Sequence, residues 1–321
     1  MSIRRYALWL GFITVFYGTW TAYLTASEAW HLLGDHWPIA LSMALGSYFA
    51  GSTPMGGGTV GFPVLVFGFD YPTQIGRDFS LAVQSIGMTS ASLLIWCRKQ
   101  PLARTVLKGA IIGVTLGLPI GLFAISPWVP EFAIKALFAV LWACFGIYHL
   151  RYGPELQLQT GFVSHHHSTD FRVGLLLGTI GGLTTVAFTG VGIDMLVYST
   201  LILTYRASIA IAIPTSVVIM AYASVYGSLL QTLTGSWSPE VITQWLAAAP
   251  IVALGAPLGV LVVSRLAPRT NIAIVSMLCL AQFVWFLLIE RQHLSPATTV
   301  LLMALAMGTW SLLIKLKDLS R

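Results

Sequence analysis

Two glycine-rich stretches are the places where this chain could bind a small solute. The first is GSTPMGGGTVGFP, Gly51–Pro63, and the second is TGVGIDML, Thr189–Leu196. Both interrupt apolar sequence, where an unsatisfied peptide group costs several kcal/mol. Glycine permits a positive φ and close backbone approach, and Pro63 suits the first turn of a new helix. The pattern therefore predicts a helix break and a new helix start at each stretch.

Paired helix starts of this kind predict an anion site. Free N–H groups and the positive ends of two helix dipoles would point into one cavity and hold an anion without a fixed cation. The helices after the breaks carry FSLAVQSIGMTSAS and IPTSVVIMAYAS, which add hydroxyl and amide donors. The alternative for each hydroxyl is a bond to its own helix or a packing contact. The expected substrate-binding residues are Thr53, Gly56, Gly57, Gly58, Thr59, Gln84, Ser85, Thr185, Thr189, Gly190, Gly192, Thr215 and Ser216.

Asp194 is the carboxylate of this candidate site, within a turn of the second helix start. It could cap that helix by accepting N–H groups. It could instead carry a coupled proton, because ionisable groups inside membranes are costly and usually functional. An ionised Asp194 would compete with an anion for the same helix end. We therefore expect Asp194 to be protonated when an anion is bound.

Other reactive residue types give weaker signals. Arg77 and Asp78 begin the helix after the first short segment. They could be a substrate-attracting pair at the outer mouth, but we interpret them as interface charges that anchor a helix end. The run SHHHSTD, Ser164–Asp170, favours a solvated loop, since consecutive histidines do not easily bind one ion. The three cysteines lie at or in apolar segments and are interpreted as buried thiols: Cys97, Cys144 and Cys279. We expect no metal, no cofactor and no catalytic residues.

Membrane helices must position these groups, because 56% of the residues are hydrophobic and only 9% are charged. A span needs about 20 residues of low charge. The candidate long segments are 6–26, 37–53, 73–97, 102–125, 131–150, 172–189, 207–233, 241–264, 271–289 and 295–314, with shorter ones at 59–69 and 191–204. We predict an all-α integral membrane protein with about eight full spans and two helical hairpins. The first stretch is long enough for a retained helix and not a cleaved signal peptide.

The lysines and arginines predict the orientation. With both termini in the cytoplasm, only Arg77, Lys135 and Arg291 of the 17 Lys and Arg residues face outside. Positive charge gathers on the cytoplasmic side of membrane proteins. The charge of +6 is spread over short loops, which argues against nucleic acid binding. We expect a multi-pass protein of a bacterial inner membrane.

An internal repeat follows from a second pair of motifs. LGLPIGL, Leu116–Leu122, matches LGAPLGV, Leu254–Val260, and each follows its glycine-rich break in the same order. The matching helices enter the membrane from opposite sides, so the halves are inverted, which is typical of secondary transporters with a midplane site. The expected divisions are an extra helix at 1–36, a first repeat at 37–150, a cytoplasmic linker at 151–171, an inverted repeat at 172–290, and a C-terminal helix with a basic tail at 291–321.

The glycine-rich break, its counterpart TGVGIDML, the following AIPTSVVIMA and the paired LGxPxG motifs resemble the TauE/SafE family of sulfite and organosulfonate exporters. The resemblance covers roughly residues 37–290. It implies a carrier of small sulfur-containing anions such as sulfite, thiosulfate or sulfonates. The departures from the family pattern are Thr53-Pro54 ahead of the glycines of the first motif and Asp194 in the second.

Three functional classes remain open from the residues alone. The first is a small-anion carrier, and export is the simpler direction because a potential that is negative inside expels anions, by roughly 2.3 kcal/mol per charge per 100 mV. The second is a membrane-embedded enzyme acting on lipid-linked substrates. The third is a proton-coupled carrier of another small solute, which Asp194 would suit. The expected partners are the anion, the bilayer and protons, with homo-oligomerisation left open.

Overall fold

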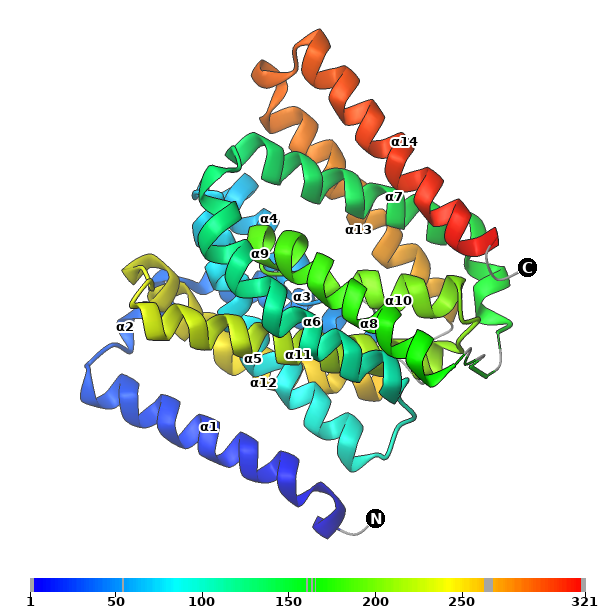
Figure 1. Ribbon diagram of the computed structural model, residues 1–321. Helices are drawn as coiled ribbons and strands as arrows, with labels where there is room; N and C mark the ends of the chain where they lie inside the picture. Colours follow the sequence, from blue (N-terminus) through cyan, green and yellow to red (C-terminus); the bar gives the residue numbers. More distant parts are fainter. Residues whose placement is uncertain are drawn as a thin grey trace.

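The computed structural model describes residues 3–53, 55–159, 161–162, 164, 166–262 and 268–318 (Figure 1). Within these residues the regular structure is helical, and eight helices are long and apolar enough to cross a membrane. The predicted class, an all-α integral membrane protein, is confirmed. Arg265 and Arg321, which the sequence assigns to the basic end, lie outside the described residues.

The helices follow the predicted order. Their bounds are α1 Ala7–Ala26, α2 His31–Asp35, α3 Trp37–Ser52, α4 Gly58–Pro63, α5 Thr73–Cys97, α6 Arg104–Ile120, α7 Glu131–Gln157, α8 His167–Gly181, α9 Ala187–Thr189, α10 Ile193–Leu203, α11 Ile209–Thr234, α12 Pro239–Val262, α13 Pro268–Ile289 and α14 Pro296–Asp318. Single π-helical turns extend α4, α6 and α8 as η2 Val64–Gly68, η3 Gly121–Ile125 and η5 Gly182–Val186. Short 3₁₀ turns lie at η1 Ile3–Tyr6, η4 Ser126–Trp128 and η6 Arg291–His293.

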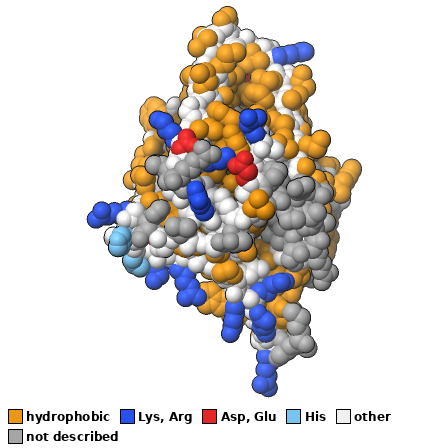
Figure 2. All heavy atoms as spheres, turned by 90° about the vertical axis from the view of Figure 1, so that its right-hand side faces the viewer, with side chains coloured by type: hydrophobic (Ala, Val, Ile, Leu, Met, Phe, Trp, Pro, Cys, Tyr) orange, Lys and Arg blue, Asp and Glu red, His pale blue; other side chains and the backbone are white. Residues whose placement is uncertain are grey.

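Both ends of the chain lie at one end of the helix bundle (Figure 1). Arg5 donates to the carbonyls of Cys97 at 2.7 Å and Arg98 at 2.9 Å, which ties η1 to the end of α5. Lys317 pairs with Glu155 at 2.8 Å, which ties α14 to the end of α7. Figure 2 looks at this end and shows lysines and arginines gathered there. The predicted segregation of positive charge is therefore present in the fold.

Four helix pairs form the framework. Gly109, Gly113 and Gly117 of α6 contact the α8 backbone in rising order, so these helices run parallel. Gly255 and Gly259 of α12 contact α3 in the same way. By contrast, α5 packs antiparallel on α11, and α7 packs antiparallel on α13. The LGxPxG glycines thus allow each repeat to pack closely on the broken helix of the other.

The carbonyls that prolines leave unbonded in these helices find side-chain donors. Pro63 ends α4 and is not in its first turn as predicted, because α4 already begins at Gly58. Its missing N–H frees the Thr59 carbonyl, and Gln282 of α13 donates to it at 2.9 Å. The carbonyls of Leu246, Ala253 and Thr115 also lack a backbone donor, because a proline follows each of them four residues later. They accept hydrogen bonds from the side chains of Trp20, Ser90 and Tyr226 respectively. Apolar surroundings explain why these donors are needed.

Two predictions on individual residues have clear outcomes. The cysteines are free and buried, as expected: Cys97, Cys144 and Cys279. The interpretation of Arg77 and Asp78 as interface charges is wrong. Arg77 is 7% exposed and Asp78 is 2% exposed, because η4 and α11 cover them.

Candidate functional site

The structure brings the two helix breaks into contact. A Cβ on Gly58, at the start of α4, would come within 2.8 Å of Ser80 Cβ and Gln84 Nε2, and closer still to Val191 of the second break. Gly190 packs on the same Ser80 from the other side. Only a residue without a side chain fits at Gly58 and Gly190. At this site the two breaks therefore pack directly against each other, and both contact α5.

Gln84 ties α5 to the second break through its amide. Its Nε2 donates to the Gly190 carbonyl at 3.0 Å and to the Ser80 carbonyl at 3.2 Å. Its Oε1 is buried and accepts no hydrogen bond. Of the predicted donors, Gln84 is the one that bonds across to the opposite break. Ser80 was not predicted, although it lies one turn before Gln84 in the same polar run.

The two carboxylate oxygens of Asp194 differ in their hydrogen bonds. It is 1% exposed, and its Oδ1 accepts from the N–H groups of Gly192 at 3.1 Å and Met195 at 3.0 Å. Its Oδ2 is buried without a partner. Oδ2 and the free Oε1 of Gln84 both lie within 3.0 Å of the position that a Cβ on Gly56 would take. Two unpartnered acceptor oxygens therefore flank Gly56.

This arrangement suits a proton. No basic side chain among the described residues forms an ion pair with Asp194. A protonated Oδ2 would be a donor near the free acceptor Gln84 Oε1. An ionised carboxylate would instead leave Asp194 Oδ2 and Gln84 Oε1 without a donor in an apolar interior. The helix cap on Oδ1 persists in either state. The capping and proton-carrying interpretations of Asp194 are thus compatible.

The two breaks use glycine for different reasons. In the second break Gly190 has φ 75° and Gly192 has φ 106°, which are left-handed conformations as predicted. In the first break no described glycine has a positive φ, and Gly57 has φ −57°. A positive φ at Gly57, which glycine would permit, is therefore not adopted, and close approach explains glycine at Gly56 and Gly58.

Trp142 of α7 lies between the breaks and was not predicted. Its Nε1 donates to Thr59 Oγ1 at 3.2 Å, and its ring edge would meet a Cβ on Gly192 at 3.0 Å. Thr185 lies against the same Gly192. A tryptophan in a uniformly apolar helix gives no sequence signal. Thr59 and Thr185 therefore both lie at the contact between the two breaks.

The remaining hydroxyl groups are used within their own helices. Thr53, Ser85, Thr185, Thr189, Thr215 and Ser216 each donate to a carbonyl three or four residues earlier. Thr215 also accepts from the Ala103 N–H, just before α6 at the basic end of the bundle. The structure therefore does not place Thr215 with the two breaks. The hydroxyls of Ser85 and Ser216 bond within their own helices and not to the breaks.

Two small cavities border the first break. Cavities of about 10 Å³ lie beside Gly56, toward α13, and beside Gly57, toward α12. A cavity of that size holds about one water.

Among the described residues, no three His, Cys, Asp or Glu side chains lie close enough together to hold a metal ion. His166 and His167 are exposed, and Asp170 accepts from Ser164. His165 lies outside the described residues.

Comparison with known proteins adds one finding. Residues 39–286 match the model of a protein family described as "Sulfite exporter TauE/SafE". The match includes both breaks, both LGxPxG motifs and Asp194. No curated protein and no solved structure matches the chain.

Proposed function

Because the chain belongs to the sulfite exporter TauE/SafE family, we propose that it is a secondary transporter of small sulfur-containing oxyanions such as sulfite, sulfonates or thiosulfate. The observation that carries this proposal is the contact between the two breaks. Gly58 meets Val191, and Gln84 spans from α5 to Gly190. Two helix starts that meet inside an apolar bundle supply positive dipole ends for an anion.

We propose that the transporter consists of two inverted repeats, 37–150 and 172–290. The antiparallel α5–α11 and α7–α13 pairs and the parallel α3–α12 and α6–α8 pairs support this symmetry. Transport would then follow from movement of one broken-helix unit against the other, with the anion at the breaks.

We propose that a proton on Asp194 accompanies the anion. The free oxygens Asp194 Oδ2 and Gln84 Oε1 on either side of Gly56 support a shared proton. An anion at the start of α10 repels an ionised carboxylate there, so anion and proton bind together. Release of one favours release of the other.

The charge distribution suggests how the protein is oriented in the membrane and in which direction the anion moves. The basic end would face the cytoplasm of a bacterial inner membrane, as positive charge does in membrane proteins. With one proton bound per anion, a potential that is negative inside still drives a dianion such as sulfite outward, whereas a singly charged sulfonate crosses without net charge. Export is therefore the favoured direction for a dianion.

The test is transport by the purified protein in liposomes. We expect sulfite or a taurine-like sulfonate to move, and a neutral analogue of similar size not to move. Variants of Asp194 and of the exposed Asp35 serve as site and surface controls. If neither anion moves while the protein is folded, the transporter proposal is refuted. Turnover of a lipid-linked substrate would favour the enzyme alternative.

A further inference from the structure

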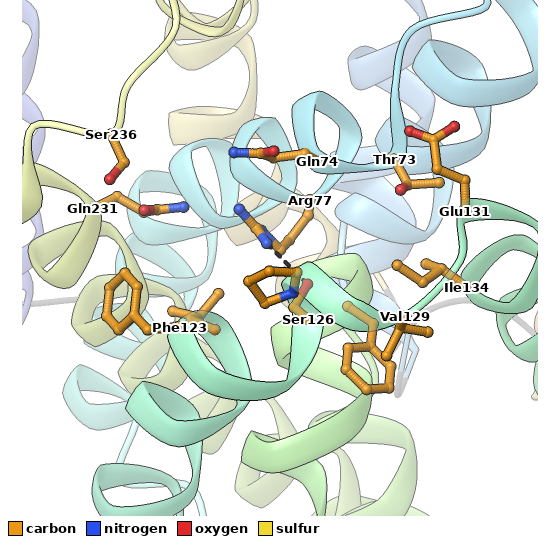
Figure 3. Close-up of a pocket in the computed structure, with 13 residues that line it drawn as sticks. Thr73, Gln74, Arg77, Phe123, Ser126, Val129, Glu131, Ile134, Gln231 and Ser236 are labelled. Carbon is orange, nitrogen blue, oxygen red and sulfur yellow. Dashed lines mark hydrogen bonds between the residues drawn. The ribbon is translucent and has the colours of Figure 1, made fainter.

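A cavity of about 310 Å³ opens at the end of the bundle opposite the chain termini (Figure 3). The start of α5, the η4 turn, the start of α7 and the end of α11 surround it. Its volume falls at the lower end of small-molecule sites, which span about 300–1,000 Å³. It is distinct from the two breaks, none of whose glycines line it.

Arg77 forms the polar floor of this cavity. Its Nε donates to Asp78 at 2.7 Å and its Nη1 donates to Ser126 Oγ at 3.2 Å. Gln231 donates to the same Asp78 carboxylate and so fixes it in place. An arginine carries five N–H donors, so three remain without a described protein partner. The guanidinium is buried, anchored and still able to bind an oxyanion through a planar fork.

The walls of the cavity differ in chemistry. Gln74 and Ser236 add polar groups, while the apolar lining lies on two sides of Ser126, with Phe123 on one side and Val129 and Ile134 on the other (Figure 3). The carboxylate of Glu131 also lines the cavity, but it is exposed at the rim, where solvent screens its repulsion of an anion. A ligand that fits both walls has a charged oxyanion head and a short apolar tail.

The cavity lies directly above the second break. Phe188 lines it and precedes Thr189 in the chain, and the Arg77 carbonyl contacts Gly190. Arg77 and Gln84 are seven positions apart on α5, which is roughly 10 Å along a helix. An anion bound at Arg77 would therefore lie roughly 10 Å from the breaks.

We propose that this cavity is an anion vestibule that takes a small organosulfonate, with the sulfonate head on Arg77 and the carbon chain on the apolar lining. The proposal rests on the proposed transport function and narrows its substrate class. It gives the protein a second anion site at the mouth of the pathway.

Protection of a single cysteine from labelling tests the vestibule. Ser236→Cys places a thiol in the cavity, while the native cysteines are buried and give little background. We expect 1-propanesulfonate to slow its reaction with a neutral maleimide, and methanesulfonate to need a roughly 15-fold higher concentration, since each of its two missing methylenes is worth about fourfold in affinity. Propylammonium should give no protection. Ser295→Cys, exposed at the same end, is the control that no sulfonate should protect.

Two further variants assign the residues. Arg77→Gln combined with Asp78→Asn removes both buried charges together, and the protecting concentration should rise about tenfold or more. Phe123→Ala, at a half-exposed position, should make propanesulfonate no better than methanesulfonate. Equal labelling with and without sulfonate, or protection that survives loss of Arg77, overturns the vestibule. Protection without any anion transport in liposomes would overturn the proposed function and leave the vestibule standing.

Discussion

Replacing Asp194 with Asn should stabilise the protein and remove its dependence on pH. Asn keeps an oxygen at Oδ1 for the N–H groups of Gly192 and Met195. It also turns the unpartnered Oδ2 into an N–H₂ donor, close to the unpartnered Oε1 of Gln84. The substitution removes one unsatisfied buried oxygen, and we expect its N–H₂ group to form a new hydrogen bond to Gln84 Oε1. A buried unsatisfied group costs about 1–3 kcal/mol, so we expect a gain of about 2 kcal/mol and a melting temperature higher by a few degrees.

The wild type reaches the same bond only by taking up a proton. The folded protein then binds more protons than the unfolded chain, so the free energy of unfolding falls as pH rises. Melting temperature in detergent and anion flux in liposomes, both measured between pH 5 and 8, should therefore vary with pH in the wild type. Asp194→Asn should give flat profiles of melting temperature and flux.

A double-mutant cycle checks the partner. In a Gln84→Met background, Asp194→Asn has no acceptor to reach, and its stabilising effect should be lost. Asp35→Asn, on the surface of α2, is the matched control and should change neither profile. Superimposable pH profiles for wild type and Asp194→Asn would show that Asp194 is a helix cap alone, since Asn caps about as well as Asp.

Three further predictions follow from the packing and the topology. Gly58→Ala should destabilise the protein by about 1–3 kcal/mol through overpacking, whereas Gly57→Ala, whose Cβ meets nothing closer than 3.4 Å, should melt like wild type; equal melting of the two variants would contradict the contact between breaks. Gln282→Leu should cost about 1–3 kcal/mol because the Thr59 carbonyl loses its donor, and an unchanged melting temperature would show that water replaces it. Cysteines at Ser164 and Ser238 should react with an impermeant reagent from opposite sides of the membrane, and reaction from the same side would refute the inverted topology.

The sequence predicts the breaks because their signals are local. Glycine and proline act on their own backbone, so Gly51–Pro63 and Thr189–Leu196 could be located without knowledge of any neighbour. The basic end is predictable for a similar reason, since each lysine or arginine reports its own side of the membrane. The left-handed turn at Gly190 and Gly192 also belongs to this class.

The missed features depend on distant parts of the chain. Gly58 must be glycine because Val191 and α5 occupy the space beside it, and nothing in the first break reveals this. The place of Pro63 at the end of α4 depends on Gln282 of α13, which satisfies the freed carbonyl. Arg77 and Asp78 are buried only because Ser126 and Gln231 cover them. Such contacts appear only when the helices are packed.

The pattern of glycine contacts predicts which helices move together. In α3–α12, backbones meet at Gly51 and Gly259, and the α6–α8 pair is packed in the same way. Interfaces this close act as rigid units, so each broken helix should move with its partner from the other repeat, and sliding should occur elsewhere. Ser47→Cys with Gly255→Cys places two thiols across α3–α12, where a Cβ on Gly255 would lie 2.9 Å from Ser47 Cβ. A disulfide needs only a small opening of this gap. We expect the oxidised variant to transport anion at nearly the rate of its reduced form. A rate that falls on oxidation and recovers on reduction would show instead that α3 slides on α12 during transport.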